Sequence, residues 1–156
     1  FIKSGEQQHT TLNGEDVESK IRTMEVADGA SRVSTIGFVR KHLVALQQKM
    51  GEQKGIVMDG RDITTVVFPN AELKIFVTAA PETRAQRRFD ELKEKGDNVL
   101  YEDILKQVIE RDYRDSHRSE SPLTQTADSM LLDNTNLNKE EQFELIKTWF
   151  NNAVKE

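Results

Sequence analysis

The sequence of 156 residues contains no cysteine, which excludes a disulfide framework and a zinc site built on thiolates. Its longest apolar runs, residues 55–58 and 130–132, are far too short to span a membrane. It also shows no signal-peptide pattern. We therefore expect a protein of the cytoplasm, where a reducing environment suits a chain without disulfides.

An excess of basic residues is absent too. The net charge is −5 and the isoelectric point is about 5.3, which argues against nucleic acid as a partner. Arg84, Arg87 and Arg88 form a local basic group, but Glu91 follows and no aromatic residues are interleaved for base stacking. We interpret this group as a solvated helix face. With 36% hydrophobic and 31% charged residues, the composition is typical of one soluble globular domain.

A phosphate-binding P-loop is the third absence. Gly55 and Gly60 have the glycine spacing of that motif, but Arg61 and Asp62 stand where it needs Lys and then Ser or Thr. The chain opens on Phe1-Ile2-Lys3 without an initial Met, in a pattern typical of the middle of a strand. We therefore expect that an N-terminal part precedes these residues.

Hydrophobic periodicity and turn residues predict alternating strands and helices. Residues 1–24, with turns at Ser4-Gly5 and Asn13-Gly14, are expected to form a hairpin-like segment of short strands. Helical periodicity follows from residue 25. Its clearest stripe, expected to face inward, consists of Val39, Leu43, Leu46 and Met50.

Three apolar runs predict buried strands, at residues 55–58, 73–77 and 130–132. Helices are expected from Pro81 to near Gly96, from near Tyr101, and after Asn138, which forms a capping-box pattern with Glu141. Their expected inward residues are Ala85, Phe89, Leu92, Ile104, Leu105, Val108, Ile109, Phe143, Ile146, Phe150 and Ala153. This alternation predicts an α/β fold with an open parallel sheet, although three strands make a thin one.

Polar residues follow the first predicted buried strand. Asp59, Arg61 and Asp62 lie there, and in open α/β sheets ligands bind at the carboxyl ends of the strands. Two carboxylates and a guanidinium could bind a phosphate, a base edge or a hydrated metal ion. A solvated turn rich in Asp and Gly explains the same residues. Position alone leaves both interpretations open.

A second group lies on the helix after residue 101. Arg111, Asp115 and Arg118 share one helical face at i, i+4 and i+7, where two guanidinium groups around a carboxylate could hold a phosphate and a ribose hydroxyl. The alternative is a solvated face with ion pairs that contribute little. A third and weaker pair is Ser31 with Arg40, which flanks the stripe that contains Val39.

Together these segments resemble bacterial cytidylate kinases over essentially the whole chain, in order. Residues 55–69, GIVMDGRDITTVVFP, are similar to the family's signature segment. Further similar segments are Asn13–Val17, Ile21–Thr23, Val26–Ser31, Val39–Arg40, Leu73–Phe76, Arg111–Asp112, Arg114–Asp115 and Leu132–Asp133.

The resemblance implies a three-layer P-loop nucleoside-monophosphate kinase fold that lacks its N-terminal strand and P-loop. It implies that residues 1–24 end the monophosphate-binding insert, that residues 25–156 form the core domain, and that a lid with Arg114 spans about 112–122. The implied reaction transfers the γ-phosphoryl group of ATP, with Mg²⁺, to CMP or dCMP. The family's members are expected to be monomeric.

The resemblance also implies a role for each site residue. Ser31, Arg40 and Asp62 match positions that contact the cytosine edge. Arg61 and Arg118 match arginines that hold the acceptor phosphate, and Arg111 and Asp115 match the pair near the ribose. Asp59 matches a carboxylate that holds hydrated Mg²⁺.

Two departures from the family pattern bear on the loops. Thr64 stands where the family usually has Gly, so a positive φ there would be strained. Ala80, a weak helix cap, precedes Pro81 where the family often has Ser.

Two alternatives stay open. Because the P-loop is missing, the 156 residues could be a nucleotide-binding piece without activity. The enzyme could also act on another pyrimidine monophosphate such as UMP, since a carbonyl in place of an amine at the base edge is a small change. Loss of the central strand would also leave unpaired edges at Ile56 and Ile75, so we expect the chain by itself to self-associate.

Overall fold

Asn13 and Gly14 form the tight turn of a β-hairpin, because both have positive φ, 52° and 86°, a conformation that Asn and Gly adopt readily. They connect β3 (Thr11–Leu12) to the antiparallel β4 (Glu15–Asp16). A second antiparallel pair, β1 (Ile2–Ser4) and β2 (Gln7–His9), precedes them. The structure, a computed structural model, describes residues 2–4 and 7–154. The predicted short strands are confirmed, whereas the turn at Ser4-Gly5 lies partly outside the described residues.

Residues 1–41 and 42–156 form two compact units, each described by itself. In the first, the 3₁₀ turn η1 (Lys20–Arg22) leads into helix α1 (Met24–Val33), whose cap Thr23 accepts a hydrogen bond from the Val26 amide. Glu18 accepts hydrogen bonds from Thr10 and Arg22, which lower its pKa to about 2 and connect the hairpin to this turn.

Helix α2 (Gly37–Gly51) confirms the helix predicted from periodicity, but its apolar stripe is not buried. Leu43, Leu46 and Met50 are all exposed. Periodicity predicts a helix from the spacing of its apolar residues, but it contains no information on which element covers them.

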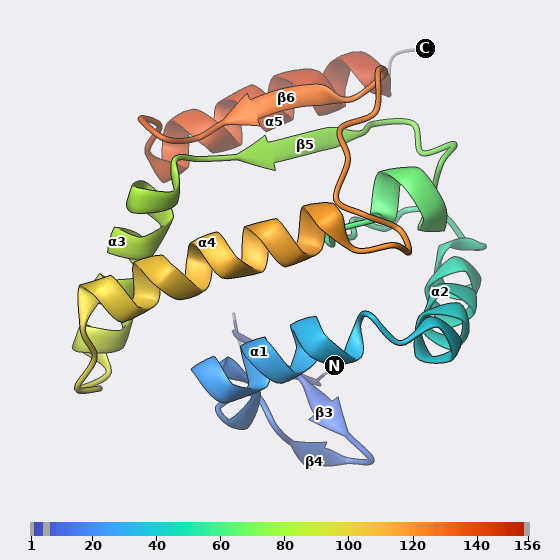
Figure 1. The fold of residues 1–156 in the computed structure, drawn as a ribbon. Coiled ribbons are helices and arrows are strands. Elements are labelled where there is room, and N and C mark those ends of the chain that lie inside the picture. Colours follow the sequence, from blue (N-terminus) through green and yellow to red (C-terminus); the bar gives the residue numbers. More distant parts are fainter. Residues whose placement is uncertain (1, 5–6, 155–156) are drawn as a thin grey trace. The chain divides into compact units, whose positions relative to one another are not determined.

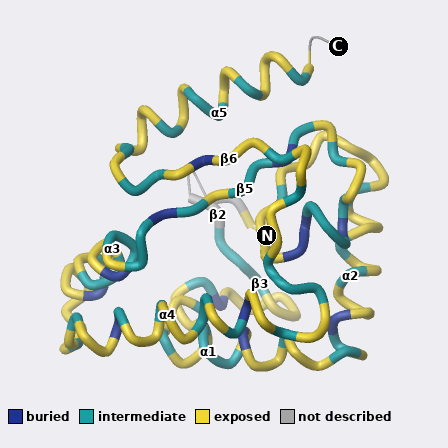
Figure 2. The backbone as a smooth tube through the Cα atoms, turned by 45° about the horizontal axis from the view of Figure 1, so that its top comes forward, coloured by how far each residue is buried: buried dark blue, intermediate teal, exposed yellow. Residues whose placement is uncertain are grey.

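The second unit is built around two parallel strands, β5 (Ile75–Thr78) and β6 (Met130–Asp133). Ile75 lies opposite Met130 and Thr78 lies opposite Asp133, so both strands end at the same edge. Both views of the molecule show this pair between helix α5 (Lys139–Ala153) and helix α4 (Tyr101–His117) (Figures 1 and 2). The strands predicted at 73–77 and 130–132 are thus confirmed, with small shifts of their ends.

The helices of this unit begin and end at the predicted signals. Helix α3 (Pro81–Glu94) has Pro81 in its first turn, and Gly96, at φ +85°, follows its end. Ala80 provides no side-chain cap, as expected, and its amide donates instead to Oγ1 of Thr135 at 2.9 Å. Asn138 and Glu141 complete the predicted capping box of α5.

The core is small, and Figure 2 shows buried positions scattered along the backbone of this second unit. Ala85 and Leu92 of α3, Ile104 of α4 and Leu132 of β6 are buried. Phe89 and Tyr101 pack edge to face, with their ring centroids 6.2 Å apart. The prediction that Ile109, Phe143 and Phe150 face inward is wrong, since all three side chains are exposed.

Residues 55–58 are the main correction to the predicted fold. They form no strand, and Val57 is fully exposed rather than buried. A strand needs a neighbour to pair its backbone N–H and C=O groups. No strand among the described residues pairs with this segment.

The following turn, η2 (Ile63–Val67), is a short π-helical turn with Ile63 and Val67 buried. Thr64 lies in it without a positive φ, since among the described residues other than glycine only Asn13, Lys54 and Ser121 have one. Thr64 therefore does not have the backbone strain that a positive φ would cause. No described helix has the length and apolar character needed to cross a membrane.

Candidate functional site

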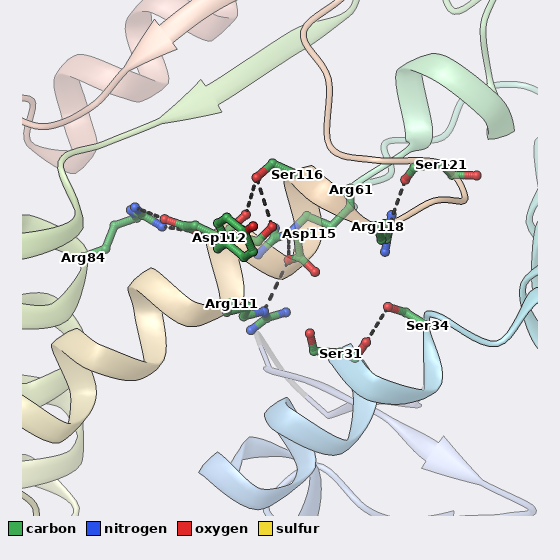
Figure 3. A network of polar contacts seen from close by, with 11 residues as sticks. Ser31, Ser34, Arg61, Arg84, Arg111, Asp112, Asp115, Ser116, Arg118 and Ser121 are labelled. Carbon is green, nitrogen blue, oxygen red and sulfur yellow. Dashed lines mark hydrogen bonds and ion pairs between the residues drawn. The ribbon is translucent and has the colours of Figure 1, made fainter.

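Asp115 is the buried centre of the candidate site, with 4% of its side chain exposed. It lies in the last turns of α4. The guanidinium Nε of Arg61, from the loop that follows residues 55–58, donates to its Oδ2 at 2.8 Å (Figure 3). This contact joins residues 54 positions apart and is the kind of charge-assisted hydrogen bond that a buried carboxylate requires.

Arg111 lies one helical turn before Asp115 and contacts the same carboxylate oxygen, with its Nε 3.6 Å away. The Nε atom is buried and makes no hydrogen bond. The Arg61 and Arg111 side chains remain about two-fifths exposed, 41% and 43%. Two cations therefore meet one buried anion, and both keep donor groups that an anionic ligand can approach.

Arg118 follows α4 at its C-cap and has an extended backbone, so it is not on the regular helical face predicted for it. Its Nε donates to the carbonyl oxygen of Ser121 at 2.8 Å. Ser121 has a positive φ of 49°. The amide of Leu123 donates a hydrogen bond to the carbonyl oxygen of Asp115. The chain after α4 thus folds back onto the end of the helix within residues 118–123.

The two aspartates of the same loop differ in exposure. Asp62 is buried, with 8% exposed, whereas Asp59 is exposed. Asp62 immediately precedes η2, whose last two amides, those of Val66 and Val67, donate to its carbonyl oxygen. A buried carboxylate beside Arg61 in the sequence does not fit the interpretation of residues 59–62 as only a solvated turn.

Ser31 and Arg40 belong to the first unit and are both buried, at 4% and 9% exposed. Arg40 donates from its terminal guanidinium nitrogen to the carbonyl oxygen of Ser34 at 3.1 Å. Ser34 also donates to the carbonyl oxygen of Ser31. These contacts place the two predicted residues in one local polar cluster between α1 and α2, so Arg40 is more than a snorkelling boundary residue.

Arg84 is the residue that sequence analysis missed. It lies on α3 and forms a two-pronged ion pair with Asp112 of α4, at 2.8 and 2.5 Å (Figure 3). Its Nε donates to the carbonyl oxygen of Ala79. Arg87 reaches both Asn134 Oδ1 and the Asn134 carbonyl oxygen after β6. The interpretation of these arginines as a solvated face is therefore wrong for Arg84, which is half-buried, whereas Arg87 is exposed as expected. No local pattern in the sequence indicates partners this far along the chain.

The common edge of β5 and β6 is held by a second polar network. Asp133 accepts from the Thr135 hydroxyl at 2.6 Å and from its amide, and these hydrogen bonds lower the pKa of the Asp133 carboxyl. The same Thr135 oxygen accepts from the Ala80 amide. Strand β6 is thereby joined to the N-terminus of α3.

Among the described residues, no three His, Cys, Asp or Glu side chains lie together as metal ligands. Mg²⁺ often uses only one or two protein carboxylates, with nucleotide phosphates and water as its other ligands. The exposed Asp59 fits that limited role.

Comparison with known proteins agrees with the resemblance seen in the sequence. The family model for cytidylate kinase matches residues 2–152. A protein named cytidylate kinase from Flavobacterium johnsoniae is 62% identical over 144 residues, covering 92% of this chain and 63% of that protein. A second, from Bacteroides thetaiotaomicron, is 59% identical over 94% of this chain and 64% of its own length. A third, from Parabacteroides distasonis, is 61% identical over 90% of this chain.

The chain therefore spans somewhat less than two thirds of the length of these curated relatives. The family match nevertheless extends over nearly all of the 156 residues, and it includes every candidate site residue described above. This chain belongs to the cytidylate kinase family.

Proposed function

We propose that the protein is a nucleoside-monophosphate kinase that transfers the γ-phosphoryl group of ATP to CMP or dCMP, giving CDP or dCDP. The observation that carries the proposal is the meeting of Arg61 and Arg111 at the buried carboxylate of Asp115. One anion between two permanent cations leaves about one positive charge uncompensated. A nucleotide phosphate is a natural ligand for such a group, and membership of the cytidylate kinase family supports this choice.

The acceptor nucleotide would be held by four residues, from the loop before η2, from α4 and from the position directly after α4. We assign Arg61 and Arg118 to the acceptor phosphate, where their forked donors match its oxygens. We assign Arg111 and Asp115 to the ribose side. Phosphoryl transfer requires positioning and charge neutralisation more than covalent participation by the protein, and this set provides both.

The base would be recognised by Ser31, Arg40 and Asp62. All three are buried polar residues, so their hydrogen-bonding groups can discriminate between substrates once water is excluded. Asp62 would accept from the amino group that distinguishes cytosine from uracil. This assignment favours CMP and dCMP over UMP as acceptors.

Mg²⁺, when bound with ATP, would neutralise charge on the transferring phosphoryl group. We assign Asp59 to hold it through water. The monophosphate-binding insert would end within residues 1–24, and the core would comprise residues 25–156. Residues 112–122, with Arg114, would act as a lid that excludes water from both nucleotides. We further propose that the enzyme is a cytoplasmic monomer that acts on small nucleotides.

A second candidate function is nucleotide binding without catalysis by these 156 residues alone. The absence of a P-loop motif from the sequence favours it, because that motif normally cradles the phosphates of the donor. The two candidates differ in whether the isolated chain turns over ATP and CMP, but both predict that it binds CMP.

The test combines turnover with binding. The complete protein that carries this sequence is assayed for ADP formation with ATP, Mg²⁺ and each of CMP, dCMP, UMP and AMP, while calorimetry measures CMP binding to the 156 residues. We expect turnover with CMP and dCMP by the complete protein, and CMP binding without turnover by the 156 residues. Faster turnover of AMP or UMP than of CMP would refute the acceptor assignment.

A further inference from the structure

Arg84 connects three parts of the second unit. From α3 it reaches back to the carbonyl oxygen of Ala79, in the segment between β5 and α3. Its two terminal nitrogens reach across to the two carboxylate oxygens of Asp112 on α4. A lysine could not make these three contacts together, because only the planar fork of arginine pairs with a carboxylate through two parallel bonds.

Asp112 occupies an informative position on α4. It follows Arg111 directly and precedes Asp115 by three residues, so it lies on the helical turn that presents both. Helix α4 is therefore tied from two sides near its C-terminal end. Arg84 holds it from α3 through Asp112, and Arg61 holds it from the loop before η2 through Asp115 (Figure 3).

We propose that Arg84 is a positioning residue for the acceptor nucleotide. Its ion pair with Asp112 fixes the rotation and translation of the end of α4, so that Arg111 and Asp115 meet the nucleotide in the correct geometry. The inference rests on the proposed function, because it needs Arg111 and Asp115 to contact the acceptor. Arg84 itself acts only through the helix.

If Arg84 only stabilised the fold, its loss would lower CMP affinity no more than it lowers folding stability. The Arg84 and Asp112 side chains are about one third exposed, 34% and 37%, and ion pairs at such positions contribute little to folding stability. Small displacements of binding groups, in contrast, have large effects on ligand binding and turnover. The loss in CMP affinity should therefore exceed what the loss in folding stability explains.

The experiment measures CMP affinity by calorimetry in the complete protein, with folding checked by thermal unfolding. We expect Arg84→Ala to raise the Kd for CMP about tenfold. Arg84→Lys, which keeps the charge but not the fork, should raise it by a smaller factor. Lys106→Ala is the matched control, since it removes one positive charge and an ion pair within α4 from an exposed side chain. It should leave the Kd unchanged.

Replacing Arg84 in a protein that already carries Arg111→Ala tests whether Arg84 acts by positioning Arg111. If Arg84 acts through Arg111, adding Arg84→Ala to Arg111→Ala changes the Kd by less than about twofold, although the same substitution costs about tenfold alone. An equal loss in both backgrounds, or a wild-type Kd in a folded Arg84→Ala variant, overturns the inference. If Arg84→Ala does not fold, a wild-type Kd for Arg84→Lys overturns it in the same way.

Failure of the underlying function gives a separate result. If Arg111→Ala itself leaves the Kd for CMP unchanged, the proposed acceptor site is wrong and the role of Arg84 is wrong with it. If Arg111→Ala weakens binding while both Arg84 variants bind CMP like the wild type, the acceptor site stands and only the positioning role is refuted.

Discussion

Asp115 determines the charge balance of the candidate site at the scale of single residues. A carboxylate buried to 4% exposure is costly unless charged groups and hydrogen bonds compensate it. Arg61 supplies the short hydrogen bond, whereas Arg111 lies farther away at 3.6 Å. Arg61 therefore has two functions in our proposal, since it satisfies Asp115 and offers its remaining donors to the acceptor phosphate.

Replacing Arg61 by Ala should lower kcat/KM for CMP strongly, by about 2–4 kcal/mol in transition-state terms, because a charged donor to the phosphate is lost. Steady-state kinetics of the complete protein measure the effect. Lys54→Ala is the control, since Lys54 forms only an exposed ion pair with Glu72. An unchanged kcat/KM in the Arg61 variant would show that Arg61 does not contact the reacting phosphate.

Replacing Asp62 by Ala should narrow the preference for CMP over UMP. A site that accepts a hydrogen bond from a substrate amino group rejects an analogue without that group, and the rejection disappears with the acceptor. The measurement is the ratio of kcat/KM for CMP to that for UMP, so a general loss of activity or stability cancels. Asp59→Ala provides the comparison from the same loop, because Asp59 is exposed. An unaltered ratio in Asp62→Ala contradicts the role in base selection.

Among the elements, β5 depends on an ion pair at its start. Lys74, just before β5, is buried with 8% exposed, and its ammonium donates to Asp128 at 2.6 Å. This hydrogen bond holds the pKa of the Asp128 carboxyl below its ordinary value of 3.8. Because the amide of Met130 also donates to the carbonyl oxygen of Lys74, the pair supports the first rung between β5 and β6.

The sign of the resulting pH dependence follows from the direction of the pKa shift. A carboxyl with a lower pKa in the folded state stabilises the fold above its unfolded pKa, and that contribution is lost as the pH falls through the folded value. We therefore expect Asp128→Asn to lower the free energy of unfolding at pH 7, and the difference from wild type to shrink below about pH 4. Urea unfolding at several pH values measures this free energy.

The control is Glu72→Gln, in an exposed pair, which should lower the free energy of unfolding less at pH 7. If the difference between Asp128→Asn and wild type stayed the same at low pH, it would contradict the linkage.

Local sequence signals predicted the ends of helices and the turn well. Burial and long-range ion pairs were not predictable, because they depend on residues far away in the sequence. The cap at Asn138, the start at Pro81 and the turn at Asn13-Gly14 depend only on neighbouring residues, and all three are confirmed. Burial of Phe143 was wrong, because it depends on what packs against the helix. Arg84 was missed for the same reason, since its partner lies 28 residues further along the chain.

The candidate site was predictable in part. The spacing of Arg111 and Asp115 indicated a shared helical face, and the structure brings Arg61 to the same carboxylate. The extended backbone of Arg118 was not predictable, because no Gly or Pro stands directly at the end of the helix at His117.

At the scale of the whole molecule, the small core leaves much apolar surface uncovered. Val57 is fully exposed, and Val77 and Leu131 are 57% and 52% exposed. Strands β5 and β6 form a sheet of only two strands within the described residues, so each has an edge without a strand partner there. Unpaired edges flanked by exposed apolar side chains favour pairing between molecules.

We therefore expect the 156-residue polypeptide to self-associate through these edges, with exchange of elements between copies as one route. Light scattering should give a mass that rises with concentration above the 17.9 kDa of one chain. Val77→Lys should reduce the association, because it places a charge at an exposed position of β5. Val154→Lys adds the same charge at another exposed valine, beyond the sheet at the end of α5, and should reduce it less. A mass that stays at one chain across all concentrations would contradict the prediction, and equal effects of the two lysines would assign the association to net charge rather than to the strand edges.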